Sequence, residues 1–572
     1  MAKESKHPKG LMVLFFTEMW ERFGFYLMLG IFTLYMLAGG DEKFPGLGLN
    51  RAESADIYGT YLALVYLTPF FGGLLADRVL GYRKSIFIGG LLMASGYIGL
   101  SIPNSMPMFF GSLMLIILGN GLFKPNISVL LGKLYEGDQY AHLKDSGFSI
   151  FYMGINLGAF VCNFVAAYLR IKYGWGWAFA AAGVGMIIGV VWLMFGQMAA
   201  PRIKEVDVIT PPNKDDMTLM QIFLKLFVPA LIAAIIGWII PGNIFGADST
   251  DAFLFFSIPI VLFYINLVRT APEKEKEPIK ALLSIMGVVV VFWAIFHQNG
   301  SALTFWAKNN TDRVISQSIE PAFSFLELVE EVSTIPREVE ESGLHGEKGE
   351  TVVGPSYYFK NYTKALPTGL TERPDDISKE YWDEHVKDKV EVSNYGAIKL
   401  WPTELQASIN PGYIIILTPL VVGFFGFLAR RGKEPSTPAK IGYGLLITSL
   451  SMTVMVGAAI VSDSGLTKTS AGWLFGIYGV ITVGELFLSP MGLSLVSKLS
   501  PKRIAALMMG GWFLSTAIGN KLSGVLSGFW DAFDKKEYFF LTNVGLTLIA
   551  AIAIFLLLPW LRKVVEENTG NS

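Results

Sequence analysis

Apolar segments long enough to cross a lipid bilayer recur along almost the whole chain of 572 residues. A bilayer core about 30 Å thick needs roughly 20 helical residues to span it. Six such segments come first, two follow, and six more complete the chain, at 11–38, 55–76, 85–102, 107–132, 147–169, 177–197, then 219–240 and 253–268, then 281–307, 409–430, 438–461, 472–497, 503–530 and 538–562. We therefore predict an all-α polytopic membrane protein with about fourteen transmembrane helices.

The composition supports lipid as the solvent and excludes several other classes. Only 16% of the residues are charged, against about 25% in a soluble domain. The run from residue 11 to 38 is longer than the apolar part of a signal peptide, so we interpret it as the first transmembrane helix. The single cysteine, Cys162, and five scattered histidines predict no disulfide, no metal site and no cofactor. A net charge of −1 without a basic tail gives no indication of a nucleic-acid partner.

Basic residues in short loops predict the orientation, because such loops stay on the cytoplasmic side. The basic loops at 77–84, 430–433 and 498–503 fall on one side if both chain termini are cytoplasmic. Arg170 and Lys172 lie on the opposite side in this scheme and are exceptions to the rule.

The arrangement of the segments predicts four parts of the chain. We expect a six-helix bundle at 1–200, a linker with two additional helices at 201–280, and a second six-helix bundle formed by 281–307 together with 401–572. The remaining part, 308–400, is a polar and acidic extracytoplasmic insertion between helices seven and eight.

Two descriptions of the insertion stay open at this point. A long polar segment between helices is commonly a loosely ordered loop. Aromatic residues at 357–359 and 381–382 could instead supply a small core for a folded unit.

Three ionisable residues lie deep in the first helix, where a charge is costly unless it faces a cavity or a partner. Glu18, Glu21 and Arg22 share one helix face, and Arg22 lies roughly 15 Å from the start of the helix. Two carboxylates beside one guanidinium can hold a proton or exchange it for a ligand carboxylate. The alternative is a buried ion-pair network with a purely structural role.

Further charges interrupt later helices. Lys124 precedes Pro125 in the fourth helix, and Glu485 lies near Pro490 in the tenth helix of the twelve, so we expect both helices to break there. A cation in one half and an anion in the other suit a zwitterionic ligand, although the two residues could also pair with each other. Lys521, near a helix end, is expected to extend toward the membrane surface.

His297 lies midway along the predicted seventh helix. With a reference pKa of about 6.5 it could titrate at physiological pH. A neutral, hydrogen-bonded histidine is the alternative.

Five stretches, in order along the chain, resemble signatures of one family. The first, EMWERFGFY, is similar to the ExxERFxYY signature of the proton-dependent oligopeptide transporters of the major facilitator superfamily. The stretches are 18–26, 73–84, 123–128, 148–158 and 484–494, and the resemblance covers nearly the whole chain except 308–400.

This resemblance implies a major facilitator fold of six plus six helices, with the two extra helices found in bacterial members. It implies a symporter that imports di- and tripeptides with protons by alternating access across the cell inner membrane, and no enzyme activity. We expect a monomer in the lipid bilayer. By resemblance, proton coupling falls to Glu18, Glu21 and Arg22, the peptide carboxylate to Arg22 and Lys124, the peptide amino group to Asn156, Asn410 and Glu485, further peptide contacts to Tyr26 and Tyr66, and the side-chain pocket walls to Trp293 and Trp512.

Three positions depart from the family pattern. The second aromatic position of the signature is Phe25, the arginine expected further along helix one is Leu29, and the glutamate expected in helix seven is His297. In typical members that arginine and glutamate pair across the outer gate. We infer that the gate closes differently here and that His297 carries part of the coupling.

Two alternative functions remain. The same fold could carry another small zwitterionic or anionic solute, although a simple anion would not require Glu485 beside Lys124. The chain could also be a non-transporting peptide sensor, with the insertion docking a partner, but a sensor would not need the titratable cluster on helix one. A pump driven by its own nucleotide hydrolysis is disfavoured because no GxxxxGK[ST] loop is present.

The departure at His297 generates a first prediction. If this imidazole takes part in coupling, His297→Gln will alter the pH dependence of proton-driven uptake, because glutamine cannot titrate. The measurement is the uptake rate in liposomes across a series of external pH values. An unchanged profile would remove His297 from the coupling hypothesis.

Overall fold

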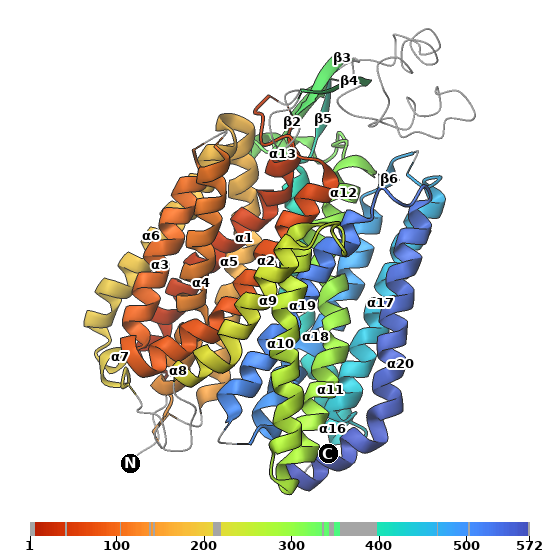
Figure 1. Cartoon of the computed structure of the whole chain (residues 1–572). Helices are drawn as coiled ribbons and strands as arrows, with labels where there is room; N and C mark the ends of the chain where they lie inside the picture. Colours follow the sequence, from red (N-terminus) through yellow and green to blue (C-terminus); the bar gives the residue numbers. More distant parts are fainter. Residues whose placement is uncertain are drawn as a thin grey trace.

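The computed structural model describes residues 6–39, 43–102, 105–136, 139–140, 143–209, 219–333, 337–342, 348–354, 397–465, 467–501 and 504–569. Long helices run side by side along one axis, and both chain termini lie at the same end of the molecule (Figure 1). We call this the terminal end. The opposite end, which carries the short strands, is the insertion end.

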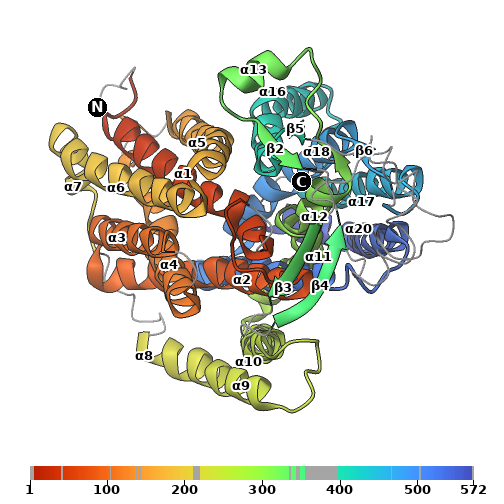
Figure 2. The same ribbon diagram turned by 90° about the horizontal axis from the view of Figure 1, so that it is seen from above.

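The first six long helices form one side of the molecule when it is seen along the axis (Figure 2). Their hydrophobic side chains, such as Leu14, Phe32 and Phe123, build one continuous core. The helices are α1 (Gly10–Leu37), α2 (Arg51–Leu75), α3 (Tyr82–Leu100), α4 (Met106–Leu134), α5 (Lys144–Tyr173) and α6 (Trp175–Ala199).

A second set of helices builds a separate core, with Phe292, Met452 and Phe540 among its buried members. Its first helix is not continuous: α11 ends at Phe296, a 3-10 turn follows at His297–Gly300, and α12 then continues toward the insertion end. The prediction that His297 lies within an unbroken helix is therefore wrong. The set consists of α11 (Glu273–Phe296), α12 (Ala302–Asn309), α16 (Ile409–Arg430), α17 (Thr437–Val461), α18 (Gly472–Leu499), α19 (Ala505–Gly528) and α20 (Lys536–Thr569).

Two further helical segments lie at the edge of the molecule, beside α2 and α19 (Figure 2). One comprises α8 (Leu219–Ile222), a π turn at Phe223–Phe227 and α9 (Val228–Ile239), and the other is α10 (Asp248–Thr270). The short α7 (Arg202–Glu205) follows α6. With both sets, the described residues thus contain fourteen membrane-length helical segments, which confirms the predicted fold class.

Judged by length and composition alone, ten of the described helices are long enough and apolar enough to cross a membrane. The first helix does not meet them because Glu18, Glu21 and Arg22 interrupt its apolar sequence. Many large apolar side chains, such as Ile549 and Leu556, are exposed on the outside of the bundle, as expected where lipid is the solvent.

Local sequence explains where several helices begin. The side chain of Asn50 accepts a hydrogen bond from the amide of Glu53, and the Glu53 carboxylate accepts one from the amide of Asn50, which forms a capping box at the start of α2. Ser105 caps α4, and Pro107 occupies its first turn, where no helical amide donor is needed.

The predicted breaks in the fourth and tenth helices of the twelve are wrong, because α4 continues through Pro125 and α18 through Pro490. Helix α4 is bound to α2 directly beside this proline. Asn126 Nδ2 donates to the carbonyls of Leu122 at 2.7 Å and of Gly72, on α2, at 3.3 Å. Packing by neighbouring helices makes proline tolerable within transmembrane helices.

Short strands and one short helix are found in the described parts of the insertion. Strand β2 (Glu330–Ser333) pairs antiparallel with β5 (Ala397–Leu400), and β3 (Arg337–Ser342) pairs antiparallel with β4 (Lys348–Gly354). Helix α13 (Glu320–Phe325) precedes β2, and β1 (Thr311–Asp312) pairs parallel with β6 (Thr469–Ser470). The two ends of the insertion are therefore joined by a β ribbon, whereas the aromatic residues at 357–359 and 381–382 lie outside the described residues.

The close approach of α2 and α4 generates a second prediction. A Cβ atom added at Gly72 would lie 1.9 Å from the carbonyl oxygen of Gly121, so Gly72→Ala must push the helices apart. We expect it to destabilise the protein by about 1–3 kcal/mol, measured as a lower melting temperature in detergent. Gly111→Ala is the control, because nothing lies within 4 Å of its new methyl group. Equal stability of the two variants would contradict the packing argument.

Candidate functional site

A cavity of about 330 Å³ lies between the two sets of helices. Its volume falls within the range of roughly 300–1,000 Å³ that is typical of small-molecule sites. Every residue predicted for the site, except Glu21, lines it: Glu18, Arg22, Tyr26, Tyr66, Lys124, Asn156, Trp293, His297, Asn410, Glu485 and Trp512.

The charged cluster on α1 forms as its spacing predicts. Arg22 Nε lies 2.8 Å from Glu18 Oε1 and 2.5 Å from Glu21 Oε2, and all three side chains are buried. Glu21 lies behind Arg22, where Asn120 Nδ2 approaches its other oxygen at 3.5 Å. Two carboxylates thus share one guanidinium, and a single added proton would make the cluster neutral.

Lys124 and Glu485 do not pair with each other, so that alternative is excluded for this conformation. The ammonium of Lys124 lies 3.9 Å from the ring centre of Tyr66, a cation–π contact between α4 and α2. Glu485, on α18, accepts a hydrogen bond from Asn410 Nδ2 at 3.1 Å. The cavity therefore has two cations, Lys124 and the carboxylate-paired Arg22, on the wall of the first set, and the carboxylate of Glu485 on the wall of the second.

Aromatic rings surround His297, which lies in the turn between α11 and α12. The imidazole stacks on Trp293 at 5.1 Å and meets the ring of Tyr66 edge-on at 5.8 Å. Its Nδ1 is buried without a hydrogen-bond partner among the described residues. The interruption of the helix thus directs a polar ring into an otherwise aromatic part of the cavity wall.

The sequence analysis did not identify a further set of hydrogen-bonded polar residues that line the cavity. Tyr478 donates from its hydroxyl to Gln406 Oε1 at 2.7 Å, and Gln406 Nε2 donates to Thr304 Oγ1 at 2.8 Å. Tyr478 carried a weak signal, because it is a hydroxyl-bearing residue in an apolar helix. Gln406 carried none, since it lies in a 3-10 helix, η9 (Thr403–Ser408), directly before α16.

Comparison with known proteins identifies the family of this chain. A sequence model of the POT family matches residues 83–326 and 388–547. The chain is 29% identical to the uncharacterized transporter YclF of Bacillus subtilis (strain 168), covering 98% of this chain and 95% of that protein. It is 27% identical to a di-/tripeptide transporter of Lactococcus lactis subsp. lactis (strain IL1403), covering 97% and 96% of the two chains.

Solved structures show the same fold. The crystal structure of a peptide transporter POT in complex with sulfate superposes with a TM-score of 0.73 at 28% identity, covering 98% of this chain and 97% of that one. A mutant of a peptide transporter POT in complex with alafosfalin gives a TM-score of 0.71, also at 28% identity, covering 98% and 96%. The predicted major facilitator architecture and the family resemblance are thus confirmed.

Outside the cavity, Lys521 does not extend toward the membrane surface, and that prediction is wrong. Its Nζ is fully buried and lies 2.5 Å from Asp56 Oδ1 and 2.6 Å from Thr60 Oγ1, both on α2. Ser249, at the start of α10, accepts from the same ammonium at 3.0 Å. This ion pair joins α2, α19 and α10 at one point, and its partner lies too far away in the sequence to be inferred from a pattern.

The buried pair generates a third prediction. Lys521→Met leaves the Asp56 carboxylate without its cation, and removing one partner of a buried pair costs about 3–5 kcal/mol. Because the Asp56 side chain is 25% exposed, we expect a loss toward the lower end of that range, read as a lower melting temperature. Lys280→Met is the control, since its ion pair with Glu277 is solvent-exposed and contributes little. A similar melting temperature for both variants would disprove a stabilising role for the Lys521 pair.

Proposed function

Because the chain belongs to the POT family, we propose that it imports di- and tripeptides together with protons by alternating access. The observation that carries the proposal is the arrangement of charge in the cavity. Lys124 and Arg22 lie on the wall formed by the first set of helices, and Glu485 lies on the wall formed by the second. The similarity to a di-/tripeptide transporter of Lactococcus lactis supports the same substrate class.

The opposite charges fit the two constant parts of a peptide. Its carboxylate would bind Lys124 and Arg22, and its ammonium group would bind Glu485 with Asn156 and Asn410. Peptides differ in their side chains but share both termini, so fixed charges at the two walls accept many sequences. Tyr26 and Tyr66 would contact the peptide, and Trp293 and Trp512 would offer apolar surface to side chains without demanding hydrogen bonds.

Proton coupling follows from competition for Arg22. The guanidinium already contacts Glu18 and Glu21, so an incoming peptide carboxylate would add a third negative group to a buried cation. Protonating Glu21 removes one negative charge and frees part of the guanidinium for the peptide. His297, which also lines the cavity, is a candidate for a second titrating group.

The basic loops determine the orientation that we propose. They lie at the terminal end, so we place both chain termini in the cytoplasm and the insertion outside the cell inner membrane. Residues 1–200 would move against the unit formed by 281–307 and 401–572, with 201–280 as the linker. The protein would act as a monomer and catalyse no covalent chemistry.

The present conformation is closed at the insertion end. Thr33 Oγ1 donates to the carbonyl of Gly300 at 2.5 Å, and Asn163 Nδ2 donates to Ser408 Oγ at 3.0 Å. Each contact joins the first set to the second. A peptide bound here would therefore leave toward the cytoplasm after these contacts had formed.

A transport assay tests the proposal. We expect purified protein in liposomes to take up dialanine when an inward proton gradient is imposed, and Glu21→Gln to reduce this uptake to background, because glutamine carries no exchangeable acidic proton. Glu273→Gln is the control, since Glu273 is an exposed carboxylate at the start of α11.

Other outcomes of this assay separate the alternatives. Uptake that Glu21→Gln leaves intact would contradict the coupling role of Glu21. Folded, monodisperse protein without any uptake would contradict dipeptide transport and favour another small zwitterionic or anionic solute, or a sensor. A thermal-shift screen with amino acids, peptides and anions would then distinguish these.

A further inference from the structure

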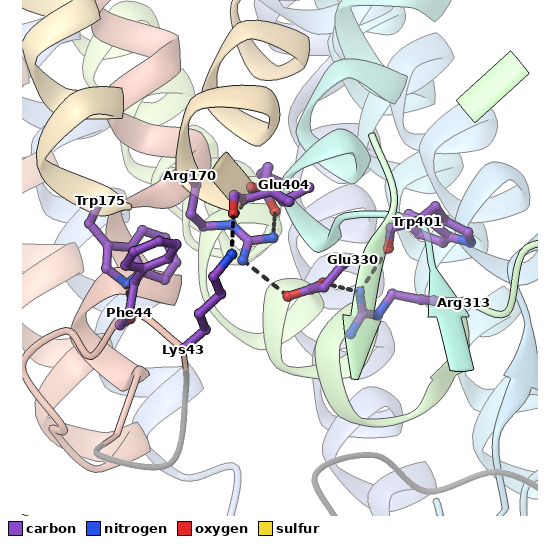
Figure 3. A network of polar contacts seen from close by, with 9 residues as sticks. Lys43, Phe44, Arg170, Trp175, Arg313, Glu330, Trp401 and Glu404 are labelled. Atoms are coloured by element: carbon purple, nitrogen blue, oxygen red, sulfur yellow. Dashed lines mark hydrogen bonds and ion pairs between the residues drawn. The ribbon is translucent and has the colours of Figure 1, made fainter. Parts of the chain in front are cut away.

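An ion-pair network joins the two sets of helices at the insertion end (Figure 3). Arg170, in the last turn of α5, donates from Nε to Glu404 Oε1 at 2.6 Å and from Nη2 to Glu404 Oε2 at 3.2 Å. Its Nη1 donates to Glu330 Oε1 at 3.0 Å. The guanidinium thus forms a bidentate pair with one carboxylate and a further charge-assisted bond with a second, an arrangement that is both strong and geometrically specific.

The second carboxylate belongs to the insertion and is held there firmly. Arg313 Nη1 donates to the other oxygen of Glu330 at 3.2 Å and to the carbonyl of Trp401 at 2.7 Å. Glu330 is the first residue of β2 and pairs with Leu400 of β5. Glu330 is therefore fixed by the ribbon that joins both ends of the insertion.

Residues of the first set of helices contact Arg170 on the side opposite Glu330. The guanidinium lies 5.3 Å from the ring of Trp175, the first residue of α6. Trp175 Nε1 in turn donates to the carbonyl of Phe44, in the connection between α1 and α2, at 2.6 Å. Figure 3 shows Trp175 and Phe44 on one side of Arg170, with Glu330 and Arg313 on the other.

The network is buried, which distinguishes it from a surface contact between the same segments. Arg170, Glu404 and Arg313 are all buried, and the side chain of Glu330 is 22% exposed. By contrast, Lys172 and Glu327 form an ion pair of 3.3 Å with 43% and 49% of their side chains exposed. Exposed pairs of this kind contribute little, so Glu327 offers a matched control for Glu330.

The network borders the cavity through the short helix η9. Glu404 belongs to η9, and Gln406 and Ala407, which follow in the same helix, line the cavity. The next residue, Ser408, donates to the carbonyl of Phe160 on α5 at 2.8 Å. Holding Glu404 against Arg170 therefore holds the cavity wall of the second set against α5.

We propose that Glu330 is a gate residue contributed by the insertion: together with Glu404 it binds Arg170 and keeps the cavity closed at the insertion end. This role rests on the alternating access proposed above but not on which solute the cavity carries. It gives the insertion a function in the transport cycle, because opening the gate requires Arg170 to leave both carboxylates.

The electrostatics of Glu330 place this gate outside the proton-coupling step. Burial alone would raise the pKa of this carboxyl, but Arg170 and Arg313 lower it from 4.5 to about 2. A lowered pKa means that the contribution of the ion pairs is complete above pH 4.5 and is lost only as the pH falls toward 2. The closed state should therefore not depend on pH between about 5 and 8 through Glu330.

Distance measurements between spin labels test the gate without any substrate. The labels are attached at Phe110→Cys, in the first set, and Val461→Cys, in the second, in a background in which Cys162→Ala removes the native thiol. Both labelled positions are exposed and lie on α4 and α17, away from the network. We expect Glu330→Gln to increase the population with a long label distance about tenfold, the typical effect of one charge-assisted hydrogen bond on a two-state equilibrium.

The controls separate gating from general stability. Glu327→Gln should leave the distance distribution unchanged, whereas Glu404→Gln should shift it at least as far as Glu330→Gln. If Glu404→Gln fails to fold, Glu330→Gln still decides the question, because its carboxylate is partly exposed. A Glu330→Gln variant with the original distances, even with a lower melting temperature, would overturn the proposal.

The result is independent of the transport assay. A shift toward long distances in protein that takes up no dialanine would support the gate and contradict the proposed substrate. Dialanine uptake together with unchanged distances in Glu330→Gln would support the transporter and contradict the gate.

Discussion

The cost of removing a charge from water governs the arrangement of this protein, because most of its described helices are surrounded by lipid. Each strongly buried ion is held by partners from other parts of the fold or from its own helix face. Arg22 has two carboxylates on α1, Lys521 has Asp56 on α2, and Arg170 has Glu404 and Glu330. Lys124 and Glu485 differ, since they form no ion pair with each other and face the cavity instead. Such groups are stable only if a ligand or water can reach them, which is the physical reason for assigning the cavity to a zwitterion.

The cost of burying polar groups also limits where the two sets of helices can form polar contacts with each other. Polar contacts such as Thr33 to Gly300 and Asn163 to Ser408 gather at the insertion end, where breaking them exposes groups that water can solvate. Along the bundle, α2 and α19 instead approach through small residues, and a Cβ atom at Gly59 would lie 2.8 Å from the Cα atom of Gly524. The same two helices are also joined by the buried ion pair of Lys521 with Asp56, so a relative movement of α2 and α19 has to keep that pair intact. The two sets of helices are thus joined by separable polar contacts at the insertion end, and by close backbone packing with a buried ion pair along α2 and α19.

Local patterns predicted much of the fold and of the cavity. The length of the apolar segments is a property of a few neighbouring residues, so all fourteen helical segments could be identified, and the spacing of Glu18, Glu21 and Arg22 placed them on one face. Predictions failed where the local structure depends on residues far away in the sequence. Helix α4 packs against α2 beside Pro125, where Asn126 donates to the carbonyl of Gly72, and the position of Lys521 depends on a partner 465 residues away. The turn at His297–Gly300 does have a local signal, because the polar run His-Gln-Asn-Gly contains an Asn-Gly dipeptide, which the prediction of a continuous helix overlooked.

Arg170 shows why an exception to a rule can be informative. Its position opposite to the basic loops contradicts a topology based on positive charge, if the residue is considered alone. In the structure its charge is cancelled by Glu404, and that of Arg313 by Glu330, so the network as a whole has two cations and two anions. The orientation bias counts lysine and arginine in short loops and is little affected by acidic neighbours, so Arg170 stays an exception to it even though its charge is paired. The sequence offered no partner for this arginine, because one of its carboxylates comes from η9 and the other from the insertion, both far away along the chain.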